Sequence, residues 1–111
     1  MSAFEAIGEF EHIVLLAVLR LGDDAYTMGI RDEILSCTGR EVSRSSVYVT
    51  LDRLESKGFL RSRLGDPTPE RGGRAKRYFQ ISAKGVKEVR DAQRMLTNMW
   101  RNLEVLQGEL A

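Results

Sequence analysis

Residues 43–63 read SRSSVYVTLDRLESKGFLRSR, and this stretch decides the fold. Its apolar residues at helical spacing are Val47, Leu51 and Leu54. Intervals of four and three place them on one face of a helix. Ser43 suits the N-cap, because a serine hydroxyl accepts a hydrogen bond from an unpaired backbone N–H, and Gly58 suits the position just after the last turn. We therefore predict a helix over residues 43–57 with a narrow apolar stripe and a broad polar face.

Two strand-like runs follow this helix, FLRSRL at residues 59–64 and KRYFQI at residues 76–81. In the first run Leu60 and Leu64 face one way, and the second run holds the aromatic and β-branched residues that favour strands. The segment between them contains two prolines and three glycines and is too long for a two-residue turn. The pattern predicts a β-hairpin with a long tip over residues 59–81.

Two further helices are expected upstream. Residues 8–21 carry apolar side chains on nearly every side, with Ala17 as a small member that lets another element approach closely. Residues 26–37 form the second expected helix, which ends before Gly39. Residues 40–42 are short enough for a minor strand.

A long final helix is expected over residues 82–107. Its apolar positions recur at intervals of three and four, which is the seam of a coiled-coil-like contact. We predict that this seam, together with the first helix, pairs with a second copy of the chain. The residues expected at this homodimer interface are Phe10, Ile13, Ala17, Val89, Leu96, Met99, Leu103 and Leu106.

The net charge of +1 conceals a strong asymmetry along the chain. Residues 1–39 carry a net charge of −5, residues 40–77 carry +5 and residues 78–111 carry +1. A polyanion would therefore meet the central third of the chain and avoid the first third.

Several other classes of protein are disfavoured. The longest apolar stretch, HIVLLAVLRL, falls short of the roughly 18 residues of a membrane span, and the acidic N-terminus lacks the basic region of a signal peptide. The single cysteine, Cys37, fits a reducing cytoplasm, and with His12 it makes no metal-binding spacing. The sequence contains no nucleophile–base grouping and no phosphate-binding loop. We expect no enzyme, no cofactor, no metal and no membrane partner.

Three helices followed by a hairpin are the order of a winged helix. The expected fold is α+β, mainly α: a winged helix-turn-helix with a long C-terminal dimerisation helix. Residues 43–57 would lie in the major groove of double-stranded DNA, where base edges are distinct. The expected DNA-binding residues of this recognition helix are Ser43, Arg44, Ser45, Ser46, Tyr48, Val49 and Arg53. The hairpin over residues 59–81 would be the wing. Its expected DNA-binding residues are Arg71, Gly72, Gly73, Arg74, Lys76 and Arg77. The wing either follows phosphates or enters the minor groove.

Two residues of the recognition helix have alternative interpretations. Tyr48 borders the apolar stripe, so it is either a core aromatic or a boundary residue whose ring packs while its hydroxyl reaches a phosphate. Asp52 would repel phosphate unless it reads a cytosine amine, pairs with a cation such as Arg53, or is kept out of the groove. We favour a tilt that inserts only the N-terminal half of the helix.

Three segments together resemble the PadR family of bacterial transcriptional regulators: GEFEHIVLLAVLRLGDDAYTMGIRDEI, SVYVTLDRLESKGFLRSR and PTPERGGRAKRYFQISAKG. The resemblance covers residues 8–90, and only YTMGI departs from the usual opening of the second helix. It implies a dimeric winged-helix repressor on a near-palindromic operator, with cytoplasmic, nucleoid-associated localisation. Residues 1–82 would bind DNA, and residues 83–111 would be the dimerisation helix of the compact branch.

The resemblance to the compact branch also implies that flat apolar or aromatic effectors bind between the helices of the dimer. The residues expected around such an effector are Trp100, Met95, Met99, Ile13 and Leu16. The alternative is that Trp100 simply fills the dimer interface. The alternative function is a winged helix that serves as a protein-interaction module, which the +5 charge of residues 40–77 disfavours.

Overall fold

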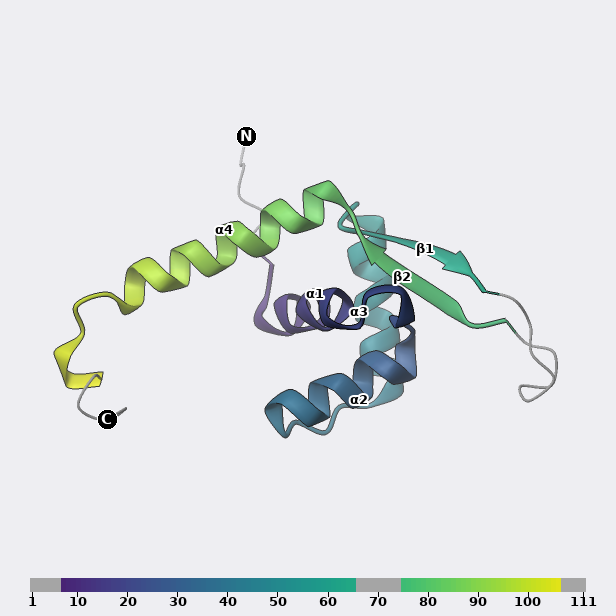
Figure 1. The fold of residues 1–111 in the computed structure, drawn as a ribbon, viewed down its shortest axis with the longest axis horizontal. Coiled ribbons are helices and arrows are strands. Elements are labelled where there is room, and N and C mark those ends of the chain that lie inside the picture. The colour runs from purple at the N-terminus through teal and green to yellow at the C-terminus, as the bar shows by residue number, and fades with distance from the viewer. Residues whose placement is uncertain (1–6, 66–74, 107–111) are drawn as a thin grey trace.

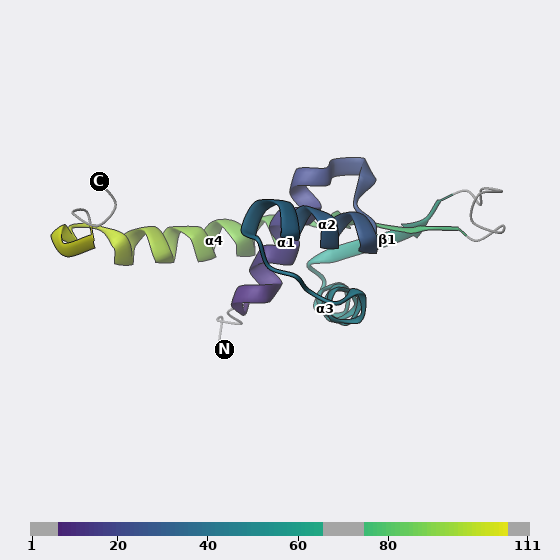
Figure 2. The same ribbon diagram turned by 90° about the horizontal axis from the view of Figure 1, so that it is seen from below.

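The structure is a computed structural model that describes residues 7–65 and 75–106. The predicted order of helices and strands is confirmed, and a helical body separates a projecting hairpin from a projecting final helix (Figure 1). The elements are α1 (Glu9–Leu21), the 3-10 turn η1 (Gly22–Asp24), α2 (Thr27–Thr38), α3 (Arg44–Ser56), β1 (Leu60–Leu64), β2 (Arg77–Ile81) and α4 (Ala83–Trp100). In Figure 2, α3 stands at one edge of the body while the hairpin and α4 run in opposite directions.

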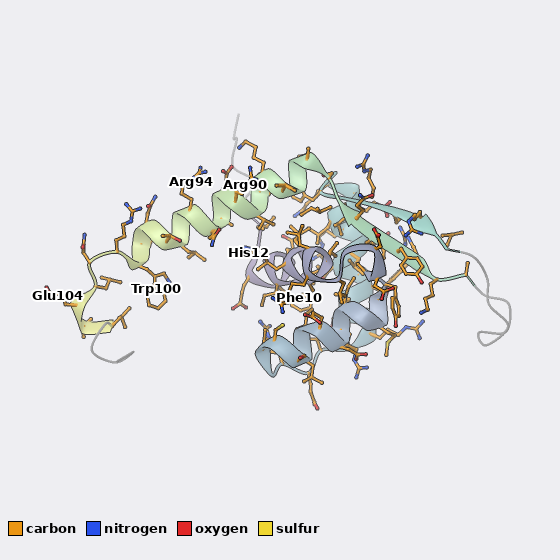
Figure 3. The ribbon with its side chains drawn as sticks, viewed as in Figure 1. Phe10, His12, Arg90, Arg94, Trp100 and Glu104 are labelled. Carbon is orange, nitrogen blue, oxygen red and sulfur yellow. The ribbon has the colours of Figure 1, made fainter. Side chains whose placement is uncertain are left out.

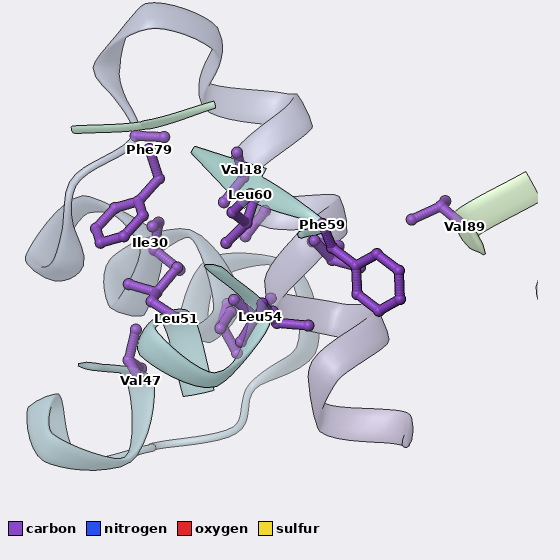
Figure 4. Packing of buried hydrophobic residues seen from close by; sticks show 14 residues of the cluster. Val18, Ile30, Val47, Leu51, Leu54, Phe59, Leu60, Phe79 and Val89 are labelled. Atoms are coloured by element: carbon purple, nitrogen blue, oxygen red, sulfur yellow. The ribbon is translucent and has the colours of Figure 1, made fainter. Parts of the chain in front are cut away.

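The hydrophobic core lies where α1 meets α2, α3 and the hairpin (Figure 4). The α3 stripe predicted from the sequence has no exposed surface: its members are Val47, Leu51 and Leu54. Val14 and Leu15 of α1, Ile30 of α2 and Phe79 of β2 complete the centre of this core. Because one face of α3 is fully buried, its opposite face is left to solvent.

The ends of α3 are as predicted. The Ser43 Oγ accepts a hydrogen bond from the Ser46 N–H at 3.0 Å, which caps the first turn. Gly58 follows the last turn with φ +84°, a backbone conformation that side chains with a Cβ rarely adopt. The Gly58 carbonyl then accepts a hydrogen bond from Ser82 Oγ at 2.6 Å, so the exit of α3 is joined to the start of α4.

The hairpin is antiparallel, with Leu60 opposite Ile81 and Leu64 opposite Arg77. The expected strand over residues 40–42 does not form. The segment that joins the sheet is Ala25–Tyr26 instead, because the Phe79 N–H donates to the Ala25 carbonyl at 2.8 Å and Tyr26 bridges to Tyr78.

The outer half of β1 lies beyond the core. Leu60 is buried as expected, but Leu64, on the same face of the strand, is 71% exposed. The alternation of the sequence is therefore correct, whereas burial ends where the hairpin passes the edge of the helices (Figure 1).

The final helix is shorter than predicted and ends at Trp100. The chain turns at Arg101, which is extended, and Asn102, which has φ +61°. Asparagine tolerates this left-handed conformation better than most residues. Leu103 and Leu106 therefore lie beyond α4, although the apolar spacing continues through them.

Two residues expected at a dimer interface are buried within the single chain. Ala17 is 3% exposed and Val89 is 8% exposed, so neither has appreciable surface to offer a partner. The first half of α4 packs on the body, and Val89 is directed toward Phe59 (Figure 4). The start of the predicted seam is thus occupied by the chain's own core.

Candidate nucleic-acid interface

The outer face of α3 gathers the residues predicted for the recognition helix. All of them are exposed: Ser43, Arg44, Ser45, Ser46, Tyr48, Val49 and Arg53. Within the described residues, the side chains of Arg44 and Arg53 form no ion pair or hydrogen bond, so their guanidinium groups are available to a ligand. The free amides of the first turn add positive potential at this end of the helix.

A cluster of hydroxyls lies at the N-terminus of α3. Ser43 Oγ donates to Ser46 Oγ at 2.8 Å and lies 3.3 Å from Ser45 Oγ. These side chains are short, so they allow a close approach of the backbone to another molecule. Hydroxyls and helix N-terminal amides are common phosphate ligands.

The base of the wing is built from alternating cationic and aromatic side chains. Lys76 Nζ lies 3.9 Å from the centre of the Tyr26 ring, and the Arg63 guanidinium lies 4.9 Å from the centre of the Tyr78 ring. The two rings meet edge to face at 5.9 Å. These contacts hold the hairpin against the start of α2.

The structure accounts for part of the predicted wing site. Lys76 is half-buried at the base of the wing, and its contact with Tyr26 orients it. The other predicted wing residues, Arg71, Gly72, Gly73 and Arg74, lie outside the described residues.

Arg77 was expected to contact DNA, but its guanidinium is engaged inside the protein. Its Nε donates to Ser62 Oγ at 3.1 Å and its Nη1 donates to Tyr48 Oη at 3.2 Å. Nη2 pairs with the Glu55 carboxylate and lies 3.9 Å from Asp52 Oδ1. Arg77 thereby ties β2 to both β1 and α3.

This arrangement shows where the two side chains with alternative interpretations lie in the structure. Tyr48 is exposed, and its hydroxyl accepts from Arg77 while its ring stays out of the core. Asp52 pairs with Arg77, whereas the sequence had suggested Arg53 as a partner. Alternation along β2 places residue 77 on the same side as the buried Phe79, and this was the available signal for the inward position of Arg77.

A buried carboxylate joins the start of α1 to the end of α3. Glu11 Oε1 accepts from the Gly8 N–H at 3.0 Å and Glu11 Oε2 accepts from Lys57 Nζ at 3.0 Å. Burial by itself raises the pKa of Glu11, but the Gly8 hydrogen bond and the Lys57 charge outweigh it and hold that pKa below its ordinary value. Glu11 therefore stays ionised and fixes the edge of α1 beside α3.

A shallow hollow lies between the start of α1 and the outer face of α3. It is lined by Phe10, Ser45, Ser46, Val49, Thr50 and Arg53. Phe10 was expected at a dimer interface, yet here it borders the recognition helix, with the Arg40 guanidinium 5.7 Å from the centre of its ring. Helical spacing places Phe10 on a face of α1 but does not show which element that face meets.

Exposed apolar side chains gather on the outer half of α4 and on α1. They are Met95, Leu96, Met99 and Trp100 on α4, and Leu16 and Leu19 on α1. In Figure 3, Trp100 hangs from the end of α4 on the opposite side to Arg90 and Arg94. The outer half of α4, which carries the residues expected around an effector on that helix, extends beyond the body (Figure 1).

The described residues contain no group of three histidine, cysteine, aspartate or glutamate side chains that could hold a metal ion. Over the same residues, no helix is both long enough and apolar enough to cross a membrane.

Comparison with known proteins places this geometry in context. A family model described as "Transcriptional regulator PadR-like family" matches residues 15–91. No curated protein matches the chain in sequence.

Solved structures share the fold. F93 from STIV, a winged-helix DNA-binding protein, has a TM-score of 0.67 at 19% identity over 88% of this chain and 98% of its own. A PadR family transcriptional regulator from Eggerthella lenta gives 0.67 at 20% over 89% and 86%, and a PadR-like transcription factor from Bacteroides fragilis gives 0.64 at 22% over 92% and 89%. The fold is therefore a winged helix.

Proposed function

The chain belongs to the PadR-like family of transcriptional regulators, and from this premise we propose that it is a dimeric repressor of bacterial transcription that binds double-stranded DNA in a sequence-specific way. The observation that carries the proposal is the outer face of α3. This face is exposed, carries three serine hydroxyls and two arginines whose side chains have no ion pair among the described residues, and stands at the edge of the body (Figure 2). It has the size and chemistry to enter a major groove.

The N-terminal half of α3 is the part proposed to meet the bases. Ser45, Ser46 and Val49 face outward there, whereas Asp52 and Glu55 lie further along the helix beside Arg77. Arg77 compensates only one of these two carboxylates, so a net negative charge remains at the C-terminal half. Phosphates would repel that charge, which favours a tilted helix. This supports the tilt expected from the sequence. The wing residues Arg71, Arg74 and Lys76 would then contact the flanking backbone or minor groove.

The proposed dimer uses the outer half of α4. Met99 is 71% exposed, and Leu96 and Trp100 are also exposed on the same amphipathic helix. A second copy of the chain would cover these side chains and place two α3 helices in successive major grooves about 34 Å apart. A near-palindromic operator follows from that two-fold symmetry. In this proposal residues 1–82 bind DNA and residues 83–111 hold the dimer together.

A planar apolar effector is a further part of the proposal. Trp100 with Met95 and Met99 offers an aromatic ring and adaptable thioethers, which suit stacking against a flat molecule. Ile13 and Leu16 of the partner copy would close the other side. Trp100 is the only tryptophan, so quenching of its fluorescence by planar compounds tests this part. If no planar compound changes this fluorescence, Trp100 would serve only as part of the dimer interface.

Salt-dependent DNA binding tests the central proposal. We expect the full chain to prefer duplex DNA from its own upstream region over unrelated duplex, and the affinity to fall steeply between about 50 and 200 mM salt as counterions are released. Because the proposed target is bacterial operator DNA, the protein would be located in the cytoplasm, at the nucleoid. Equal, weak binding to every duplex would overturn the proposal and favour the alternative, a winged helix used as a protein-interaction module.

A further inference from the structure

Val49 is an apolar side chain in the middle of an otherwise polar surface. It is 51% exposed and lies on the outer face of α3, between Ser45 one turn before it and Arg53 one turn after it. The core of the protein does not use it, since the buried stripe of α3 occupies the opposite face. Val49 is therefore free to contact a ligand from the centre of the proposed DNA-binding helix.

The hollow beside Val49 has apolar walls and a polar rim. Phe10 from α1 and Val49 from α3 supply the apolar surface, while Ser45, Ser46 and Arg53 supply hydroxyls and a cation around it. Arg40 lies over the Phe10 ring and pairs with Glu9 at 3.1 Å, so Phe10 is held in place from the α1 side. The hollow is shallow and open, so a small group that projects from another molecule can reach Val49 and Phe10.

The tilt of α3 proposed above brings this part of the helix to the base edges. Of the four bases, only thymine presents an apolar group in the major groove, the C5-methyl. Polar groups on the same base pair present hydrogen-bond acceptors that serine hydroxyls and arginine can reach. A methyl group of this size fits against a valine without displacing the surrounding hydroxyls.

We propose that Val49 and the adjoining hollow form a contact site for the C5-methyl group of a thymine in each operator half-site. This inference rests on the proposed function and specifies which base the exposed face of α3 selects. The hydroxyls and Arg53 around the hollow fix the position of α3 along the groove. Val49 discriminates thymine from bases that lack the methyl group. A cytosine or a uracil at the same position lacks the methyl group and leaves the valine against water.

Replacement of thymine by uracil is the direct test, because it removes the methyl group and changes nothing else. The operator is first isolated by selection from random duplex DNA with the full chain, and each thymine is then replaced singly by deoxyuridine. We expect one position in each half-site at which the affinity falls about threefold to fivefold, as expected for losing one buried methyl. Thymines elsewhere in the operator should tolerate the change.

The variant Val49→Ala completes a double-mutant cycle. It should bind the thymine operator several-fold more weakly than the unaltered protein and should lose no further affinity when that thymine becomes uracil. Leu35→Ala, a change of an exposed apolar residue on α2, is the matched control and should keep the full preference for thymine. Circular dichroism checks that both variants fold.

The outcomes separate the two proposals. If the protein selects an operator but no thymine-to-uracil change weakens binding, the thymine contact is wrong and the repressor function stands. The thymine contact is also wrong if Val49→Ala keeps the full preference for thymine. If the protein selects no sequence at all, the proposed function fails and the thymine contact fails with it.

Discussion

The guanidinium of Arg77 on β2 pairs with the carboxylate of Glu55 on α3, and so joins the wing to the recognition helix. Both side chains are 30% exposed, so the pair is partly shielded from water. Tyr48, Asp52 and Ser62 converge on the same guanidinium. Arg77 thereby compensates one of the two negative charges that Asp52 and Glu55 carry, and it fixes the angle between hairpin and helix.

Arg77→Ala is expected to weaken both the fold and DNA binding. The free energy of unfolding should fall by about 1–3 kcal/mol, because charged hydrogen bonds are lost and Glu55 is left half-buried without its partner. DNA affinity should fall as well, because Asp52 and Glu55 become uncompensated. Urea unfolding and DNA titration measure the two effects.

The double variant Arg77→Ala/Glu55→Ala distinguishes a positioning role from a direct contact. If Arg77 acts by neutralising Glu55, removal of both should restore part of the DNA affinity lost in the single variant. If Arg77 instead binds a phosphate, Arg77→Ala should weaken DNA binding by the same factor with or without Glu55, which the single variant Glu55→Ala measures. The second outcome would return Arg77 to the wing site predicted from the sequence.

Glu11 is expected to make stability fall in acid. Its pKa in the folded chain lies below the ordinary value of 4.5, so the unfolded chain binds more protons at this site as the pH drops. The contribution of ionised Glu11 to the free energy of unfolding is therefore complete above about pH 5. It is lost as the pH falls through the pKa of Glu11 in the folded chain. Urea unfolding from pH 7 to pH 3 should show this loss, and Glu11→Gln should make the curve flatter.

Glu33 provides the control for this measurement. Its pKa is also lowered, first by the hydrogen bond from Arg20, but that pair is on the surface. Surface pairs contribute little because water and salt screen them. Glu33→Gln should leave the acid branch of the stability curve almost unchanged, and an effect equal to that of Glu11→Gln would contradict the special role of the buried pair.

Local patterns in the sequence predict the helices and strands well. The stripe and caps of α3 were predicted because residues within one or two turns determine them, as Ser43 and Gly58 show. The predicted end of α4 was wrong because the apolar spacing continues past Trp100, whereas the backbone turns at Asn102. Periodicity records which side chains are apolar and does not record where the chain stops being helical.

The contacts within the site were harder to predict. Arg77 and Glu55 are 22 residues apart, and no local pattern pairs them. The same holds for Phe10, which was placed at a dimer interface but lies beside Val49 and Ser45. Such contacts depend on how α1, α3 and the hairpin pack, which a single sequence does not specify.

Arg53 and Arg44 are expected to differ in their effect on sequence preference. We expect Arg44, in the first turn of α3, to bind a phosphate. Arg44→Ala should then weaken binding to all sequences and reduce the slope of log affinity against log salt concentration by about one. Arg53 borders the hollow beside Val49, so Arg53→Ala should change the preference among operator variants. Titration of each variant against a panel of operators measures both. Equal losses on every sequence for Arg53→Ala would make it a phosphate ligand.

The proposed dimer predicts that a charge on the apolar side of α4 dissociates it. Leu96→Asp would place a carboxylate where a second copy is expected to pack, and burial of an unpaired charge costs far more than the contact contributes. Analytical ultracentrifugation should show a monomer, and operator affinity should fall by more than tenfold because one half-site is lost. Asn98→Asp adds the same charge on the opposite side of α4 and should leave the dimer intact. A Leu96→Asp variant that stays dimeric would show that the chain pairs through another surface.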